Sequence, residues 1–416
     1  MLKFFINISG GYKMYDYYKF AYKDLYEKHW VKTIIFFDKK LSEKSIIDNN
    51  NNYYQIFFYD SKIDLLEKIT KFNKNDIYFI NTFDEILVTL LHEIRKHLWI
   101  KVSKEYISFR NKHIQRNILI KKFSEATVDF VEIDFKKQNI DDYYKILDFP
   151  YIIKPSSWVQ SSWVWIIKNK NDLEKYIENV KILNENMISR WIDNNLFLIE
   201  EYIDGEMYTI VYFVDNDWNI SYSPIVKVNS AQNIWIDDFS NYVRLSWTII
   251  DNEVSFDEIK SFVEKHVDIF GMRNTYMFQE FKKNSKWELK NIELNARIWW
   301  YRLEMVQKIY DYNLLEMPFW NVPKLKSDFS NAVFVFYSSK KGILKWFNEK
   351  LINDYKQLDS YYNIRISNNY LWKEVWTTKD WFSSIVALRI KNKNLIQFKK
   401  DYKFIEDNYN KLIILE

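Results

Sequence analysis

Apolar and polar residues are arranged in two different ways along the chain. In the first hundred residues, short apolar runs at 3–8, 33–37, 55–59 and 77–80 are separated by amphipathic stretches. Strands that alternate with helices are typical of a parallel sheet covered by helices. We therefore expect a small Rossmann-like α/β unit in this part of the chain.

A different pattern begins at residue 196, after a basic helix expected at 109–123. Apolar and polar positions alternate in longer runs at 196–201, 207–214, 276–282 and 288–297. A period of two predicts antiparallel strands with one buried face. Together with the first hundred residues, these runs indicate an α+β protein.

The overall composition favours a folded protein that works in water. Hydrophobic residues make up 48% and charged residues 28%, close to the averages of soluble domains. The net charge of +4 is too small to indicate a nucleic-acid partner, and no uncharged apolar run of about 18 residues predicts a membrane span. The first apolar run is too short for a secretory signal, and the lack of cysteine excludes disulfides. We expect a cytoplasmic protein with no nucleic-acid or membrane partner.

Glycine and tryptophan occur in unusual numbers. The chain has 5 glycines and 17 tryptophans, whereas average usage of about 7% would give roughly 29 glycines. Several tryptophans stand where glycine is expected, such as Trp99 at a predicted helix end and Trp218 and Trp287 in predicted hairpin turns. We hypothesise that these are UGA codons which the source organism translates as glycine. The alternative is a genuinely high tryptophan content.

The first segment with candidate chemistry is YIIKPSSWVQSSWVW at residues 151–165. A predicted buried strand ends there on Lys154, and a serine-rich loop follows. With glycine at 158, 163 and 165, the loop can fold its backbone N–H groups over a polyphosphate while Lys154 supplies a positive charge. A solvated turn is the alternative, and it is the better explanation of the segment taken alone.

The second segment is FLIEEYIDGE at residues 197–206. A strand that breaks after Glu200 and Glu201 can expose backbone donors and acceptors to the edge of an adenine, with an acid nearby for the ribose. Taken alone, a charged edge strand that enters a turn is again the better explanation.

The third segment is ELNAR at residues 293–297. Because side chains alternate along a strand, Glu293, Asn295 and Arg297 share one face. A predicted tight turn would fold the strand that carries Glu280 beside them. Carboxylate and amide oxygens suit Mg²⁺, and an arginine fits beside metal-bound anions. The alternative is the exposed polar face of a sheet with a salt bridge.

The order and spacing of these segments resemble the ATP-grasp superfamily, particularly its carboxylate-amine ligases and its biotin carboxylase-like members. The resemblance covers nearly the whole chain. It rests on KPSSWVQSSWV as the lysine and glycine-rich loop, LIEEYIDG as the adenine-binding strand, and FQEF with IELNARIWW as the metal-binding strands. It implies an ATP-grasp fold with an N-terminal α/β domain at 1–105, a linker helix and lid subdomain at 106–195, an antiparallel-sheet lobe with the metal site at 196–330, and a C-terminal α+β lobe at 331–416.

The resemblance also implies roles for individual residues. Arg297 is expected to act at the reacting phosphate, and Glu280, Glu293 and Asn295 are expected to bind the metal. The residues expected to hold the nucleotide are Lys112, Lys154, Ser161, Trp163, Glu200, Glu201, Ile203 and Glu206.

The chain departs from the family pattern at several positions. Trp158, Trp163 and Trp300 fall where the family has glycine, which agrees with the recoding hypothesis. Asn111 replaces the usual aspartate before Lys112, and the acid expected to bind the ribose is displaced by one residue at Glu206.

The activity that the resemblance implies is an ATP-dependent ligation. ATP phosphorylates a carboxylate to an acyl phosphate, which an amine attacks to give ADP, phosphate and an amide. The expected cofactors are ATP and Mg²⁺, with Mn²⁺ as an alternative metal. The expected partners are small-molecule carboxylate and amine substrates such as amino acids, and a homodimer is compatible with the resemblance. A bicarbonate-activating enzyme of the biotin carboxylase type and an ATP-binding regulatory protein without turnover are the alternatives.

Three further features are interpreted as structural. His92 and His97 are five positions apart, about 140° around a helix, so they do not predict a zinc site. The turn at 9–11 lacks the GxGxxG spacing, so we assign it no cofactor. Arg244 is a candidate for contact with a carboxylate substrate, although a surface salt bridge is the preferred interpretation.

Overall fold

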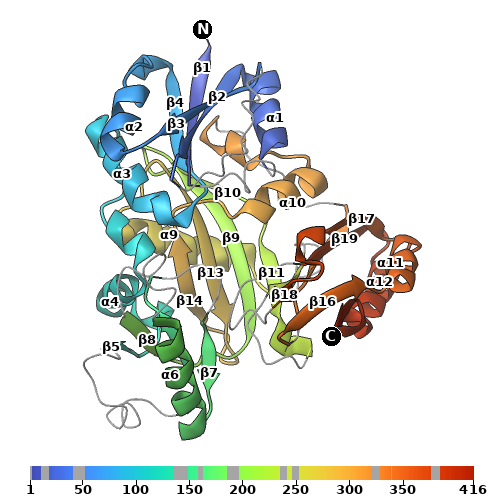
Figure 1. The fold of residues 1–416 in the computed structure, drawn as a ribbon. Coiled ribbons are helices and arrows are strands. Elements are labelled where there is room, and N and C mark those ends of the chain that lie inside the picture. The colour runs from blue at the N-terminus through green and yellow to red at the C-terminus, as the bar shows by residue number, and fades with distance from the viewer. Residues whose placement is uncertain are drawn as a thin grey trace.

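The protein consists of a parallel α/β unit, a large antiparallel sheet and two smaller sheets (Figure 1). The structure is a computed structural model. It describes residues 2–10, 18–40, 52–134, 149–157, 163–184, 196–234, 241–245, 253–319, 328–338, 340–375 and 385–416.

The N-terminal part is a parallel α/β unit, as the apolar pattern predicts. Its strands are ordered β3-β2-β1-β4, and each neighbouring pair is parallel. Helices α2 and α3 pack on one face and α1 on the other. The elements are β1 (Lys3–Ser9), α1 (Lys19–His29), β2 (Val31–Asp38), β3 (Tyr54–Tyr59), α2 (Lys62–Ile69), η2 (Lys74–Asp76), β4 (Ile77–Thr82), η3 (Glu85–Leu87) and α3 (Val88–His97). Because β1 and β4 are parallel neighbours, their carboxyl ends lie side by side.

The centre of the molecule is a large antiparallel sheet that contains three of the four alternating runs, while the run at 196–201 belongs to a smaller sheet. Its order is β14-β13-β9-β11-β12-β15-β19-β17, and β10 pairs with β9. The strands are β9 (Glu206–Val214), β10 (Ile220–Tyr222), β11 (Val226–Ser230), β12 (Asn241–Leu245), β13 (Thr275–Lys283), β14 (Leu289–Asn295), β15 (Ser330–Phe336), β17 (Tyr361–Ile366) and β19 (Val386–Asn392). The sheet is continuous through the β12–β15 pair, so it reaches into the C-terminal part of the chain.

Helices cover both faces of the β9–β13–β14 region. On one face, α4 (Lys112–Lys122) and α9 (Phe256–Phe270) share a core with these strands, together with η4 (Tyr106–Arg110) and η5 (Ser124–Ala126). On the other face, α10 (Trp300–Tyr310) and η7 (Leu314–Phe319) share a core with the N-terminal unit. This second core fixes the N-terminal unit against the large sheet.

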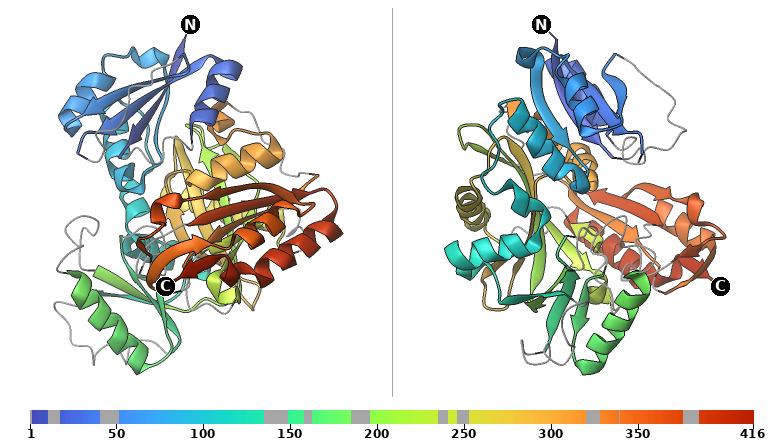
Figure 2. Two further views of the ribbon diagram at one scale, coloured as in Figure 1. Left: turned by 45° about the vertical axis from the view of Figure 1, so that its right-hand side comes forward. Right: turned by 60° about the vertical axis from the view of Figure 1, so that its left-hand side comes forward.

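Two smaller sheets flank the large one, as the two views in Figure 2 show. One, which we call the lid sheet, has the order β5-β8-β6-β7 and is covered by α6. Its elements are β5 (Phe130–Asp134), β6 (Tyr151–Pro155), β7 (Trp165–Ile167), α6 (Lys170–Asn184) and β8 (Leu196–Glu201). The C-terminal part adds β16 (Gly342–Phe347), α11 (Glu349–Lys356), η8 (Asn368–Tyr370), β18 (Glu374–Val375), α12 (Leu395–Asp407), η9 (Tyr409–Lys411) and β20 (Ile413–Leu415). The 3-10 helix η6 (Ala231–Ile234) follows β11.

The helix expected at 109–123 is divided in the structure. A 3-10 turn, η4, ends at Arg110, and α4 begins only at Lys112. Asn111 has extended backbone angles, and its side chain accepts a hydrogen bond from the Ile114 N–H. An asparagine with this geometry is an N-cap, so α4 starts after it and not at Phe109.

Tryptophans occupy most of the left-handed backbone positions. Among the described residues, eight non-glycine residues have positive φ, and six of them are tryptophans. Positive φ is uncommon outside glycine, asparagine and aspartate, and for a bulky residue it is an outlier. The six are Trp30, Trp99, Trp163, Trp218, Trp287 and Trp372.

Local hydrogen bonds show why three of these positions favour glycine. The N–H of Trp99 bonds to Lys96 and the next N–H bonds to Arg95, which is a Schellman motif at the end of α3. Trp218 and Trp287 each occupy the last position of a three-residue hairpin loop, where a left-handed residue is required. The indole rings of Trp99 and Trp287 are largely exposed, whereas that of Trp218 is about half exposed and lies under the Arg273 guanidinium. These observations support the recoding hypothesis.

Within the described residues, no helix is long and apolar enough to cross a membrane.

Candidate active site

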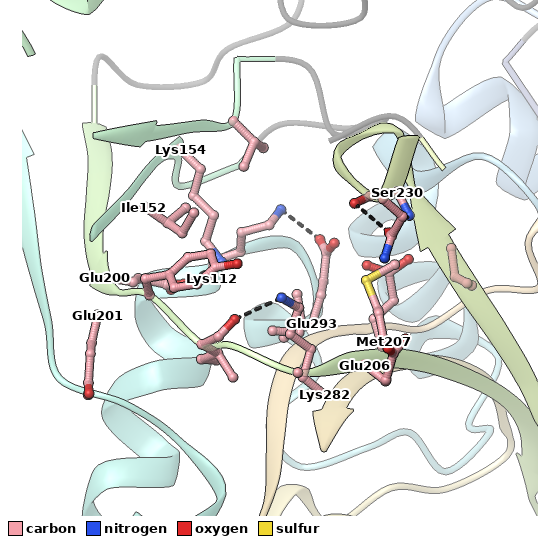
Figure 3. A pocket seen from close by; sticks show the side chains of 18 of the residues that line it. Lys112, Ile152, Lys154, Glu200, Glu201, Glu206, Met207, Ser230, Lys282 and Glu293 are labelled. Atoms are coloured by element: carbon pink, nitrogen blue, oxygen red, sulfur yellow. Dashed lines mark hydrogen bonds and ion pairs between the residues drawn. The ribbon is translucent and has the colours of Figure 1, made fainter. Parts of the chain in front are cut away.

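A pocket lies between the lid sheet and the large sheet (Figure 3). Strands β6, β8, β9, β11, β13 and β14 and the start of α4 contribute to its wall. Eight residues that the sequence assigned to the nucleotide or the metal line this one pocket: Lys112, Lys154, Glu200, Glu201, Ile203, Glu206, Glu280 and Glu293. Residues far apart in sequence therefore meet at one pocket.

The two expected metal-binding strands place their carboxylates opposite each other. In the β13–β14 pair, Glu280 is the partner of Glu293, and Phe278 is the partner of Asn295. Among the described residues, Glu280 Oε1 and Asn295 Oδ1 are buried and have no hydrogen-bond partner. Burial and the nearby charge of Glu293 raise the pKa of Glu280 to about 8. A set of buried oxygen acceptors without donors fits a hard divalent cation.

Lys112 forms an ion pair with one of these carboxylates. Its Nζ lies 2.6 Å from Glu293 Oε1, as the dashed line in Figure 3 shows. Burial alone would lower the pKa of Lys112, but the charges of Glu293 and Glu85 outweigh it and raise this pKa. Lys112 is therefore a permanent cation at the first turn of α4, directly beside the acidic pair.

A buried ion-pair network holds Lys154 at the other side of the pocket. Lys154 Nζ lies 2.6 Å from Glu200 Oε2, and Arg116 Nε donates to Glu200 Oε1 at 2.8 Å. Burial would raise the pKa of Glu200, but Arg116 and Lys154 lower it to about 2. Both carboxylate oxygens of Glu200 are thus occupied by cations, and its backbone lies between the paired strands β5 and β6, so Glu200 positions Lys154 in this structure.

The remaining nucleotide candidates follow the break after β8. Gly205 has a φ of +81°, and a Cβ there would lie 2.1 Å from the carbonyl oxygen of Lys283, so this turn requires glycine. Glu201 and Glu206 are exposed at the pocket. The carbonyl oxygen of Ile203 accepts a hydrogen bond from Lys282 Nζ at 2.7 Å. Lys282 is a basic residue of the pocket that the sequence pattern did not single out.

Arg297 lies just beyond β14 and is paired with the N-terminal unit. Its guanidinium contacts the Glu85 carboxylate, and both side chains are buried. Burial would lower the pKa of Arg297, but Glu85 and Glu293 raise it. Next to Glu85, the partly buried Asp84 accepts hydrogen bonds from Ser9 Oγ at 3.0 Å and from the Gly10 N–H at 2.6 Å. The carboxyl ends of β1 and β4 thus border the site.

Two of the predicted nucleotide residues belong to the loop of the lid. Trp163 is buried in the lid core and its side chain does not line the pocket. Its indole nitrogen has no hydrogen-bond partner among the described residues. Ser161 and Trp158 lie outside the described residues.

His92 and Arg244 were both interpreted from the sequence as structural residues. His92 is buried, bonds to the Val88 carbonyl at 2.8 Å and stacks on Tyr106. Arg244 belongs to β12, but its side chain is outside the described part of the structure.

Among the described residues, no group of three or more His, Cys, Asp or Glu could hold a metal ion. A cation at Glu280 and Glu293 would therefore also need Asn295 and oxygens from a ligand.

Residues 147–299 match the ATP-grasp domain family. The chain contains an ATP-grasp domain. This domain includes the Lys154 loop, the β8 break and the β13–β14 carboxylate pair, which are the three segments that the resemblance rested on. No curated protein matches the chain in sequence.

Solved structures extend the ATP-grasp fold to the whole chain. An L-amino acid ligase from Bacillus licheniformis superposes with a TM-score of 0.72 at 14% identity, covering 100% of both chains. An N5-carboxyaminoimidazole ribonucleotide synthetase from Thermotoga maritima gives 0.63 at 12% identity, again over 100% of both chains. The biotin carboxylase domain of a Hydrogenobacter thermophilus 2-oxoglutarate carboxylase, solved with MgADP, ADP and bicarbonate, gives 0.62 at 11% identity over 99% of this chain and 90% of that one. The ATP-grasp fold that the sequence predicted is thus confirmed.

Proposed function

We propose that the protein is an ATP-dependent ligase that joins a small carboxylate, such as an amino acid, to an amine through an acyl phosphate. The main support is the distribution of charge at the pocket. The unsatisfied acceptors of Glu280 and Asn295 lie on the strand pair that carries Glu293, and Glu280 is within electrostatic reach of Lys112 and Arg297. Buried carboxylates next to fixed cations are what a metal–triphosphate complex requires.

In this proposal, the two lysines bind the phosphates of ATP. Lys112 and Lys154 enter the pocket from α4 and β6, and each is held by a carboxylate. The backbone at the end of β8, at Glu201 and Ile203, would receive the adenine, and Glu200 would act by positioning Lys154. The exposed carboxylates of Glu201 and Glu206 are the candidates for the ribose hydroxyls, and Ser161 and Trp163 would contribute loop backbone.

Mg²⁺ would be held by Glu280, Glu293 and Asn295, and it would neutralise charge on the phosphate oxygens that it shares with these residues. The fit rests on the donor chemistry of the site, because two carboxylates and an amide oxygen are hard ligands. Without Mg²⁺, Glu280 would be protonated at neutral pH, because burial and Glu293 raise its pKa to about 8.

The proposed chemistry has two steps. An oxygen of the substrate carboxylate attacks the γ-phosphorus, the bond to the β–γ bridging oxygen breaks, and ADP leaves. The amine nitrogen then attacks the acyl carbon, inorganic phosphate leaves with the C–O bond electrons, and the amine releases its proton. Arg297 would stabilise negative charge on the transferring phosphoryl group, so the protein acts mainly by positioning and charge neutralisation.

An ADP-release assay tests the proposal. Purified protein with ATP and Mg²⁺ is screened against amino acids singly and in pairs, and the products are analysed by mass spectrometry. We expect ADP release to require a carboxylate and an amine together and to yield an amide. ADP release with bicarbonate alone would instead favour the bicarbonate-activating alternative. ATP binding without turnover on any substrate would favour the regulatory alternative.

Other expectations stay predictions at this point. They are the domain bounds 1–105, 106–195, 196–330 and 331–416, a homodimer, a cytoplasmic location and Mn²⁺ as a second metal.

A further inference from the structure

Lys282 lines the nucleotide pocket from the same strand that carries Glu280. The two residues are two positions apart on β13, whose pairing with β9 is regular, so their side chains lie on the same face of the sheet. Lys282 Nζ donates a hydrogen bond to the Ile203 carbonyl oxygen at 2.7 Å, as Figure 3 shows. Lys282 therefore reaches from the proposed metal-binding strand to the backbone where the adenine is expected.

The segment that Lys282 holds is the linker 202–205, which joins β8 of the lid sheet to β9 of the large sheet. A second hydrogen bond attaches this linker to the β13–β14 hairpin, because the Ser285 N–H donates to Asp204 Oδ1 at 3.1 Å. Neither Ser285 nor Asp204 lines the pocket, whereas Lys282 does. Lys282 is thus the contact through which the pocket wall itself fixes the linker.

The surroundings of the Lys282 ammonium group favour its position at the linker. Its charge interacts with the carboxylates of Asp204 and Glu206, and its Nζ lies 5.2 Å from the centre of the Tyr202 ring. A lysine whose charged end is held in this way can offer its methylene groups as an apolar surface. The other apolar residues of the pocket wall include Ile152, Val164, Met207 and Ile292. A flat purine base fits such a lining.

We propose that Lys282 is a positioning residue for the nucleotide. It fixes the Ile203 backbone relative to Glu280, and so aligns the base end of ATP with the metal-bound phosphate end. This inference rests on the proposed binding of ATP at the pocket. It assigns Lys282 to the base end, because its ammonium group bonds to the linker, whereas Lys112 and Lys154 are held by Glu293 and Glu200.

The neighbouring Lys283 provides a matched control. It also belongs to β13, but its Nζ pairs with Glu258 of α9 at 2.8 Å, and its side chain does not line the pocket. Both lysines are partly buried, and each donates a hydrogen bond. Methionine at either position removes the ammonium group and keeps an unbranched side chain. The two variants should therefore lose similar stability, and only Lys282→Met should affect the nucleotide.

Isothermal titration calorimetry tests the proposal with two ligands in the presence of Mg²⁺. One is a non-hydrolysable ATP analogue, and the other is tripolyphosphate, which has no base or ribose. Lys282→Met should bind the analogue about tenfold more weakly than wild type, a loss of about 1.4 kcal/mol, and should bind tripolyphosphate as wild type does. Lys283→Met should match wild type with both ligands, and Lys154→Met should bind both more weakly.

Two kinds of failure are distinguishable in this experiment. An affinity of Lys282→Met for the analogue equal to that of wild type, or an equal loss of affinity for both ligands, would overturn the role of Lys282. So would an equal loss of analogue binding in Lys283→Met. Wild type that does not bind the analogue would instead overturn the proposed function, and this inference with it.

A crystal structure of wild type with Mg²⁺ and the analogue covers the case in which Lys282→Met does not fold or tripolyphosphate binds too weakly to measure. Lys282 Nζ should still bond to the Ile203 carbonyl oxygen, and the base should lie against the methylene groups of Lys282. A base bound away from the linker 202–205, or a Lys282 Nζ bonded to phosphate, would refute the proposal.

Discussion

Glu280 should make the stability of the protein depend on pH in an unusual direction. Burial and the charge of Glu293 raise its pKa from 4.5 to about 8. Between these values the folded protein keeps a proton that the unfolded chain has lost, so stability is lost as the pH rises through this window. Without metal, we expect the free energy of unfolding to fall from about pH 5 to about pH 8, by a few kcal/mol at about 1.4 kcal/mol per pKa unit.

Urea unfolding in EDTA across this pH range measures the effect, with Glu280→Gln as the variant that cannot titrate. The fall in stability should be much smaller in Glu280→Gln, and Mg²⁺ should bind wild type more tightly as the pH rises. Identical pH profiles for the two proteins would contradict the assignment of the proton to Glu280.

The left-handed tryptophans lead to a second prediction at the scale of single residues. Replacing Trp99, Trp218 or Trp287 by glycine removes a Cβ from a position with positive φ, where a side chain costs roughly 1–2 kcal/mol. Each substitution should therefore raise the free energy of unfolding by about 1 kcal/mol, measured in urea. Trp346 on β16 is the control, because it is also exposed but has no positive φ, and glycine there should destabilise the strand.

The mass of the protein isolated from its source organism tests the recoding itself. Each position that carries glycine in place of tryptophan would lower the mass by the difference between the two residue masses. A mass that corresponds to all 17 tryptophans would disprove it.

At the scale of elements, the start of α4 controls the position of Lys112. Asn111 caps the helix through the Ile114 N–H, and the Lys112 N–H bonds to the Ser156 carbonyl beyond β6. Asn111→Ala should destabilise the protein by about 1 kcal/mol and raise the KM for ATP, because Lys112 is no longer held. Asn111→Asp should preserve both properties, since aspartate is an equally good N-cap. Equal behaviour of the two variants in the ATP titration would contradict this role of the cap.

The elements themselves were largely predictable from the sequence, and β14 shows why. A strand period of two places Glu293 and Asn295 on one face. The hairpin turn at 284–287 alone would put Glu280 opposite Ile292, but a β-bulge next to this pair brings Glu293 opposite Glu280 instead. Local periodicity therefore predicts the shared face, whereas the bulge that aligns the two carboxylates was not predicted. The start of α4 was misplaced because the propensity of residues 109–123 for helix does not reveal that the Asn111 side chain caps it.

At the scale of the whole molecule, the pair of Glu85 and Arg297 links the N-terminal unit to the proposed reaction centre. Glu85→Gln should lower kcat about tenfold or more, because Arg297 loses the partner that orients it. The KM for ATP should change little, since Glu85 does not line the nucleotide pocket. Steady-state ligase kinetics check this, and Glu93→Gln, which removes an exposed ion pair of the same unit, should behave as wild type. A rise in the KM for ATP with an unchanged kcat in Glu85→Gln would argue against this role of Glu85.

Contacts between residues so far apart in the chain could not be predicted from the sequence. Glu85 and Arg297 are 212 positions apart, and Arg116 reaches Glu200 over 84 positions. A partial signal existed for Arg116, because it lies one helical turn after Lys112 and shares its face. For Glu85 the only signal was its place after a strand of a parallel sheet, where ligand sites gather. Which acid meets which base depends on tertiary packing, which no local pattern encodes.

The left-handed turn at Trp30 also limits where the gene can be used. If its codon is UGA, an organism with the standard genetic code would terminate translation there and release β1 and α1 without β2, the strand that β1 pairs with. An organism that inserts tryptophan would make the full chain but with bulky side chains in turns built for glycine. A gene of this kind would therefore give no full-length protein after transfer to a species that uses the standard genetic code.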